Sequence, residues 1–140
     1  AGFIDGHELG NNSKSAFVTR GLTEITRLGV ALGARTETFT GLSGMGDLIA
    51  TCYSGLSRNR YVGHELARGR SAADIINGMD QVAEGVPTTH QAVALAESLN
   101  VDMPITNITK AVLDGEMDQH AAIEGLMTRA PISETPNATS

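Results

Sequence analysis

The sequence lacks tryptophan and holds a single cysteine, Cys52, among its 140 residues. Aromatic residues make up only 4% of the chain, so a core has to be built from Leu, Ile, Val, Ala and Met, a set that packs helices readily. One cysteine excludes an intrachain disulfide framework and is typical of a reducing, cytoplasmic compartment. At this length we expect one domain.

Long apolar runs and basic clusters are also missing. No stretch approaches the roughly 18 consecutive apolar residues of a membrane span, and the N-terminal residues do not follow the order of a signal peptide. The net charge is −6 at pH 7, so we expect no binding to nucleic acid or to anionic membranes. The four histidines and Cys52 show no metal-ligand spacing, and no metal site is expected.

The charges are unevenly distributed along the chain. Residues 1–70 have a balance of +2, whereas residues 71–140 have a balance of −8. A small anion held by local cations is therefore expected to bind to the first half of the chain.

Apolar residues recur at the three-to-four spacing of helices, and no segment shows the alternation of a strand, so the sequence predicts an all-α domain of about seven short helices over residues 1–130. Asn12 or Ser13 is the expected N-cap of the first helix, which should bury one apolar stripe and end at Gly33. A second helix should begin near 36 or 37 and be broken by the glycines of "GLSGMGD". Further helices are expected at 58–69, 72–78, 87–100, 104–115 and 118–127. The tail 131–140, "PISETPNATS", is expected to be disordered.

Lys14 is one of only two lysines in the chain, with Lys110. If Asn12 or Ser13 is the N-cap, Lys14 falls in the first helical turn, where free backbone N–H groups disfavour a second positive charge. That placement favours a lysine that gives up its proton, as proton-transfer catalysis requires. The alternative is an ordinary solvated lysine.

The segment "GLSRNR" indicates an anion site. A glycine turn and the expected N-cap Ser57 precede Arg58, Asn59 and Arg60 in the first turn of a helix. Cations are normally unfavourable there, and they become favourable when a phosphate or carboxylate docks on the free N–H groups. The alternative is that both arginines point to solvent.

Other candidates lie outside these two segments. Asp47 follows glycines that allow close backbone approach, and it could orient a lysine, accept from a substrate hydroxyl, or be a helix N-cap. Thr51 lies one helical turn further along. Glu84 precedes a helix and lies either on the surface or near a ligand hydroxyl. Cys52 follows an apolar run and is expected to be a buried, inert thiol.

Over about residues 1–128 the chain resembles bacterial NAD(P)-dependent glycerol-3-phosphate dehydrogenase. The likeness is carried by "AGFIDGHELGNNSKSAFVTRGLTEITRLGVALGA", "GLSGMGDLIATCYSGLSRNRYVG" and "VAEGVPTTHQAVALAESLNVDMPI". It is to the all-helical C-terminal substrate domain, of the type found at the C-terminus of 6-phosphogluconate dehydrogenase. The resemblance implies reversible reduction of dihydroxyacetone phosphate to sn-glycerol 3-phosphate for glycerophospholipid synthesis, with NAD or NADP as the cofactor.

The family's N-terminal dinucleotide-binding domain has no counterpart in these residues, because they contain no strand followed by a Gly-x-Gly turn. The resemblance therefore implies that these 140 residues alone turn over no substrate.

The resemblance also implies roles for particular residues. Lys14 matches the family's proton-transfer lysine, and Asp47 is expected to hold the substrate and that lysine in place. The other implied contacts are with the substrate for Thr51, Ser57, Arg58 and Asn59, and with the dinucleotide for Arg58, Val82 and Glu84.

Two alternatives stay open at this point. The first is a free-standing helical module that binds phosphate, or a partner, without catalysis. The second is a helical domain of a hydroxy-acid or 6-phosphogluconate-type dehydrogenase, which fits the fold and not the three segments. The preference for NADH or NADPH and the formation of a homodimer are not determined by these residues.

Overall fold

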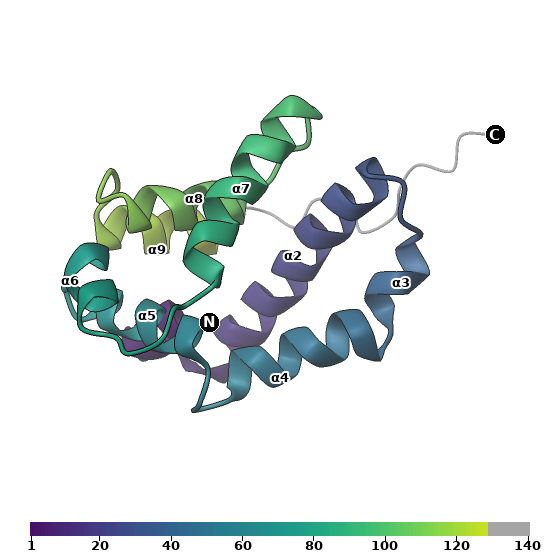
Figure 1. The fold of residues 1–140 in the computed structure, drawn as a ribbon. Coiled ribbons are helices and arrows are strands. Elements are labelled where there is room, and N and C mark those ends of the chain that lie inside the picture. Colours follow the sequence, from purple (N-terminus) through teal and green to yellow (C-terminus); the bar gives the residue numbers. More distant parts are fainter. Residues whose placement is uncertain (129–140) are drawn as a thin grey trace.

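The structure, a computed structural model, describes residues 1–128. These residues form nine α-helices and one short π-helix without a strand, so the all-α prediction is confirmed (Figure 1). The expected tail at 131–140 lies outside the described residues. The helices are α1 (Gly2–Gly6), α2 (Gly10–Ala31), α3 (Thr36–Thr40), η1 (Leu42–Gly46), α4 (Asp47–Tyr53), α5 (Arg58–Ala67), α6 (Ala72–Asn77), α7 (Gly85–Ser98), α8 (Pro104–Leu113) and α9 (Gln119–Thr128).

The core lies on the side of the molecule where α1, α5, α6, α8 and α9 meet, while α3, η1 and α4 form an arm that returns alongside α2 (Figure 1). Leu, Ile, Val and Ala side chains fill this core, as the composition predicts. Its buried members are Val62, Leu66, Ile75 and Ala83 in one cluster and Ile4, Ile105 and Leu126 in the other.

Helix α1 was not predicted, and it packs backbone to backbone against α5. A Cβ atom on Gly2 would lie 1.8 Å from the carbonyl oxygen of Arg60, and one on Gly63 would lie 2.8 Å from the nitrogen of Phe3. Only glycine permits so close an approach. The contact brings Asp5, near the C-terminal end of α1, against the first turn of α5.

Most of the predicted helix ends are confirmed. Ser57 caps α5 by accepting the N–H of Arg60 at 3.2 Å, and Ser71 caps α6 by accepting the N–H of Asp74 at 3.1 Å. Asp118 accepts two N–H groups at the start of α9. Pro87 and Pro104 lie in the first turns of α7 and α8, where their missing N–H costs nothing.

The predicted start of α2 was wrong. The helix begins at Gly10 after Leu9, not at an Asn12 or Ser13 N-cap, and no side chain caps it. The turn from α1 uses left-handed backbone at Glu8 (φ 55°) and Gly10 (φ 83°), and this turn, not a side-chain cap, starts the helix. Lys14 is consequently the fifth residue of α2 and lies in its second turn, not its first.

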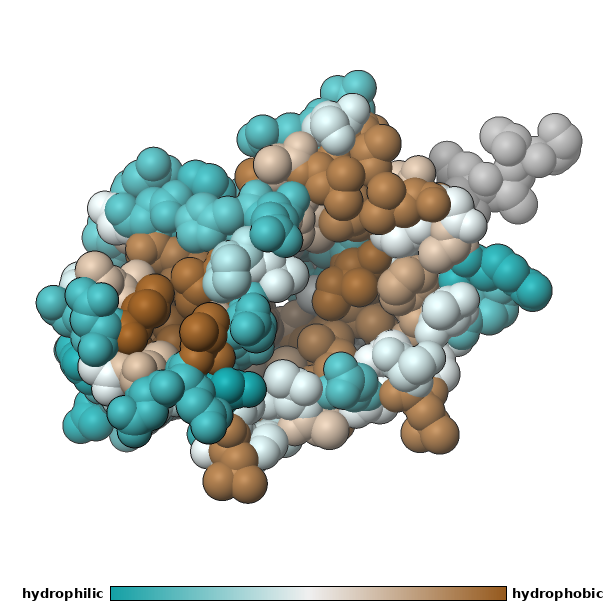
Figure 2. All heavy atoms as spheres, in the orientation of Figure 1, coloured by the Kyte–Doolittle hydropathy of each residue, from teal (hydrophilic) through white to brown (hydrophobic). Residues whose placement is uncertain are grey.

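The glycines of "GLSGMGD" interrupt the helix only at Gly41, whose backbone is extended. The following residues form the π-helix η1 and continue into α4. Helices α3, η1 and α4 contain no buried residue, and apolar residues of the predicted α2 stripe are exposed, with Ile25 at 43% and Leu32 at 57%. Figure 2 shows apolar side chains around the hollow between α7, α2 and α4. The predicted single buried stripe of α2 was therefore wrong.

A buried carboxylate joins α2 to α8. Glu24 is 4% exposed and accepts the N–H groups of Ile105 and Thr106 at 2.6 and 3.0 Å. The Thr106 hydroxyl donates a third hydrogen bond at 2.9 Å. The free N–H groups at a helix N-terminus thus compensate a buried negative charge.

Helix α2 is the longest helix in residues 1–128. Neither it nor any other helix in that range combines the length and apolar character needed to cross a membrane.

Candidate active site

Lys14 is buried, with 4% of its surface exposed, and this excludes the alternative of a solvated lysine. Its Nζ atom lies 2.8 Å from Oδ2 of Asp5 in α1 and 4.3 Å from the centre of the Tyr53 ring in α4. A buried ammonium group needs a negative partner, and an aromatic face adds further attraction. The Nζ atom of Lys14 is therefore held between α1 and α4.

The same oxygen of Asp5 also accepts a hydrogen bond from Arg60 of α5, at 2.7 Å from its Nε atom. Burial would raise the pKa of Asp5, but the hydrogen bonds from Lys14 and Arg60 outweigh it and hold this pKa below its usual range. Asp5 is thus a carboxylate at neutral pH. Arg60 is directed at α1, which differs from the alternative that both arginines of "SRNR" point to solvent.

A pocket of about 400 Å³ opens where α4 and the first turns of α5 and α7 meet. This volume falls within the roughly 300–1,000 Å³ of small-molecule sites. The lining residues are Ala50, Thr51, Ser54, Leu56, Ser57, Arg58, Asn59 and Glu84. Five of the eight residues to which the sequence assigned roles therefore line one pocket.

The polar groups of this pocket are positioned by hydrogen bonds. Nη1 of Arg58 donates to Oε1 of Gln81 at 3.2 Å, and Oδ1 of Asn59 accepts from the N–H of Gly85 at 2.9 Å. Ser57 caps α5, so its hydroxyl lies at the positive end of that helix. A guanidinium beside a helix N-terminus is an arrangement that attracts anions.

Two helices connect the pocket to the buried lysine. Helix α4 carries Thr51 on the pocket wall and Tyr53 against Lys14. Helix α5 carries Arg58 in the pocket and Arg60 on the carboxylate that holds Lys14. Within the "SRNR" segment, Arg60 is thus joined to Lys14 through Asp5.

Three predicted residues, Lys14, Asp47 and Val82, do not line the pocket. Asp47 is an exposed residue at the start of α4, and the carboxylate that pairs with Lys14 is Asp5 instead. Val82 is 59% exposed and does not line the pocket.

Cys52 is half-buried, and burial raises the pKa of its thiol more than the nearby positive charges lower it. This fits the predicted inert thiol better than a nucleophile. Within residues 1–128, no three His, Cys, Asp or Glu side chains lie together as a possible metal site.

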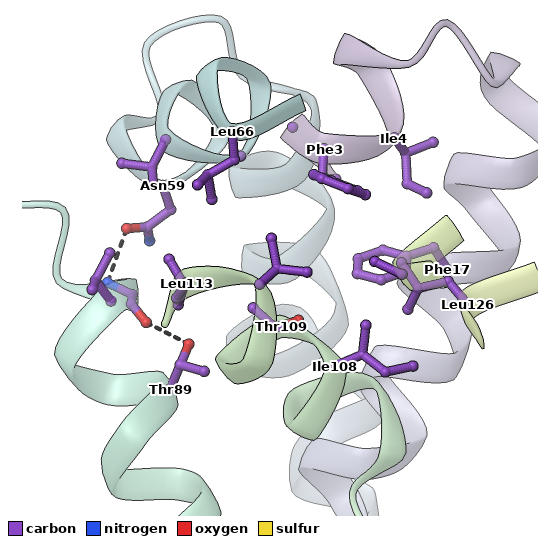
Figure 3. Close-up of a pocket in the computed structure, with 18 residues that line it drawn as sticks. Phe3, Ile4, Phe17, Asn59, Leu66, Thr89, Ile108, Thr109, Leu113 and Leu126 are labelled. Carbon is purple, nitrogen blue, oxygen red and sulfur yellow. Dashed lines mark hydrogen bonds between the residues drawn. The ribbon is translucent and has the colours of Figure 1, made fainter. Parts of the chain in front are cut away.

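A second cavity lies in the interior, between α1, α5, α7 and α8 (Figure 3). Its volume of about 200 Å³ is below the roughly 300 Å³ typical of ligand sites. Two of its polar side chains are already used, because the hydroxyls of Thr89 and Thr109 donate to the carbonyl oxygens of Gly85 and Ile105. The rest of its wall is mostly apolar, which does not suit a phosphorylated substrate.

Sequence reasoning assigned no role to Asp5 or Tyr53. Asp5 belongs to a short helix without apolar periodicity, and its one sequence signal is the pair of glycines, Gly2 and Gly6, that flank it. Tyr53 ends the apolar run after Asp47, where it reads as a core residue.

The fold and the site together define a class of protein: an all-helical domain that has a buried lysine and a pocket suited to binding an anion. The model of the family described as NAD-dependent glycerol-3-phosphate dehydrogenase C-terminus matches residues 1–124. The chain therefore belongs to this family.

Curated relatives agree with this assignment. The chain is 53% identical over 134 residues to glycerol-3-phosphate dehydrogenase [NAD(P)+] of Polaromonas naphthalenivorans, covering 96% of this chain and 38% of the relative. It is 53% identical over 133 residues to the protein of the same name from Methylibium petroleiphilum, covering 95% and 40%. It is 55% identical over 127 residues to the protein of the same name from Dehalococcoides mccartyi, and the match covers 91% of this chain and 35% of the relative. The chain thus spans about two fifths of the length of these relatives.

Proposed function

We propose that this chain is the substrate-binding part of an enzyme that reversibly reduces dihydroxyacetone phosphate to sn-glycerol 3-phosphate. Its product would feed glycerophospholipid synthesis. Membership of the family supports this proposal, and one observation carries it. The buried ammonium of Lys14 is linked through Asp5 to Arg60, which follows the pocket residue Arg58 by two positions in the first turn of α5.

The phosphate group would bind at the first turn of α5. The free N–H groups of this turn, the hydroxyl of Ser57 and the guanidinium of Arg58 all donate hydrogen bonds, which suits a dianion. Thr51 and Asn59 on the same wall would contact the hydroxyl and carbonyl groups of the three-carbon chain. Asp47 would approach the substrate from the start of α4.

Lys14 would move the proton. An ammonium group has three N–H donors, and Asp5 accepts one of them. A second N–H can donate to the C2 oxygen of the ketone and transfer its proton as the alcohol forms, and the neutral amine takes that proton back in the reverse direction. The side chain's burial keeps water away from this transfer.

The residues expected to touch the cofactor fit that task. Arg58 and Glu84 line the pocket and Val82 is exposed, so all three are accessible to a dinucleotide. Bound NADH or NADPH would supply the hydride. Most of its binding contacts would come from a dinucleotide-binding domain, in keeping with relatives much longer than this chain.

The test is an assay of the full-length protein with dihydroxyacetone phosphate and NADH or NADPH, followed by loss of absorbance at 340 nm. Substrate-dependent oxidation of the nucleotide is expected. The same assay would be run on a chimaeric protein, in which this chain replaces the 134 matching residues of the Polaromonas relative. If neither protein oxidises the nucleotide while glycerol 3-phosphate still raises the melting temperature, the chain is a phosphate-binding module and the proposal is wrong.

A further inference from the structure

Three charged residues from three different helices, Asp5, Lys14 and Arg60, meet at one carboxylate oxygen. Oδ2 of Asp5 lies 2.8 Å from Nζ of Lys14 and 2.7 Å from Nε of Arg60. The side chain of Lys14 is 5% exposed, whereas those of Asp5 and Arg60 are 20% and 29% exposed. The lysine is therefore the innermost member, and the arginine holds the carboxylate from the more open side.

We propose that Asp5 is the positioning residue for Lys14 and holds its ammonium in place for the substrate, while Arg60 weakens the attraction by which Asp5 keeps the proton on that ammonium. This inference rests on the proposed function for its kinetic part. The carboxylate of Asp5 contacts Lys14 and Arg60, so it acts through the lysine and is not itself a catalytic residue.

The geometry makes this role specific. Helix α1 cannot shift easily, because Gly2 and Gly63 bring its backbone into contact with that of α5. Asp5 is consequently fixed relative to Arg60, and Lys14 is fixed relative to Asp5. The Tyr53 ring occupies another side of the ammonium, at 4.3 Å. A donor held in this way has few alternative directions, which is what proton transfer to a bound ketone requires.

Arg60 also determines the balance of charge. A lone carboxylate at 2.8 Å would strongly favour the ammonium form and oppose release of its proton. Sharing the oxygen with a second cation weakens that attraction. The other titratable side chains near Lys14 are Cys52 and Tyr53 of α4.

The test compares Asp5→Asn and Arg60→Gln in the full-length protein, with reduction of dihydroxyacetone phosphate followed across pH. Asp5→Asn is expected to lower kcat about 10- to 100-fold and to change KM less than about threefold. Loss of the carboxylate should move the alkaline limb of the kcat profile to lower pH. Arg60→Gln removes a competing cation and should move this limb to higher pH.

The opposite signs of these shifts separate positioning from a structural role, which would not move the limb in opposite directions. Glu37→Gln is the matched control, because it removes a carboxylate paired with Arg35 on the surface and should leave kcat and the profile unchanged. If Asp5→Asn fails to fold, the Arg60→Gln shift decides the matter. An unmoved limb, or a limb moved to lower pH, in Arg60→Gln overturns the inference.

A second measurement does not depend on activity. Trace acetylation with acetic anhydride, read by mass spectrometry, reports how readily the Lys14 amine reacts, with Lys110 as the internal reference. Asp5→Asn should increase acetylation of Lys14 relative to Lys110, and Arg60→Gln should decrease it. If these changes occur in a protein that does not reduce dihydroxyacetone phosphate, the proposed function fails and the three-charge link stands. If relative acetylation is unchanged, the link is wrong whatever the activity.

Discussion

The carboxylate of Glu24 accepts the backbone N–H of Ile105 at 2.6 Å, although the two residues lie 81 positions apart. A side chain of α2 therefore does the work of a helix cap for α8. This contact ties the helix that carries Lys14 to the helical core.

Glu24→Gln should destabilise the protein by about 1–3 kcal/mol, because the amide loses the negative charge and turns a donor toward the N–H groups of α8. Chemical unfolding measures the change. Glu37→Gln, an exposed carboxylate, is the control and should change stability by less than about 0.5 kcal/mol. Equal effects of the two substitutions would contradict the role of Glu24 as a cap of α8.

Gly63→Ala should be strongly destabilising, by more than about 2 kcal/mol, because its Cβ would lie 2.8 Å from the Phe3 nitrogen and force α1 away from α5. The matched control is Gly21→Ala in α2, where a Cβ meets nothing within 4 Å. That substitution should stabilise the protein by up to about 1 kcal/mol, since alanine favours a helix. Thermal unfolding of both variants checks the opposite signs.

Lys14→Ala in the full-length protein should lower kcat by about 10²- to 10⁴-fold, the range for loss of a general acid, with a much smaller change in KM. Steady-state kinetics with dihydroxyacetone phosphate provide both constants. Equal losses in kcat and in affinity would indicate that the lysine binds substrate without transferring the proton.

Arg58→Ala should raise KM for dihydroxyacetone phosphate by about 10- to 100-fold, since a charged hydrogen bond to the phosphate is lost. Arg68→Ala is the control, because this arginine of α5's C-terminal end is exposed and lies outside the pocket. Inhibition by inorganic phosphate should weaken in the first variant alone. Unchanged inhibition would place the anion elsewhere.

His90 joins α7 to α8, and its two ring nitrogens face the Asp114 carboxylate at 2.7 Å and the Val86 carbonyl at 3.0 Å. Both partners accept hydrogen bonds, so the doubly protonated ring fits best, and the carboxylate followed by the carbonyl raises the pKa of His90. A raised folded-state pKa contributes stability that is complete below the ordinary value of 6.5 and is lost as pH rises through the raised value.

The difference in unfolding free energy between the wild type and His90→Gln should therefore shrink as pH rises from about 5.5 to about 8.5. Urea unfolding at several pH values measures it. His120→Gln, an exposed histidine on α9, should show no such trend. A difference that grows with pH would contradict the ion pair.

Sequence reasoning placed helices well where a local signal exists. Ser57, Ser71 and Asp118 accept hydrogen bonds from backbone N–H groups within three residues, so their capping roles can be recognised without the fold. The grouping of Arg58 with Asn59 was predicted for the same reason, since they are neighbours on one helical turn.

Contacts made through tertiary packing were not predictable. The start of α2 depends on a turn at Glu8 and Gly10, which carries no side-chain cap to recognise. The partner of Lys14 depends on the glycine contact between α1 and α5, and a carboxylate nine residues away has no helical or strand periodicity that marks it. The family resemblance supplied roles for residues in its named motifs, and Asp5 was not among them.

The contact among Asp5, Lys14 and Arg60 has a consequence for the order in which parts of the chain fold. Asp5 and Lys14 are separated by nine residues, whereas Arg60 is 55 residues from Asp5. Closing the shorter loop costs about 1.6 kcal/mol less chain entropy. During synthesis on the ribosome the lysine and its counterion emerge together, long before the arginine, so the amine has its partner before it is buried.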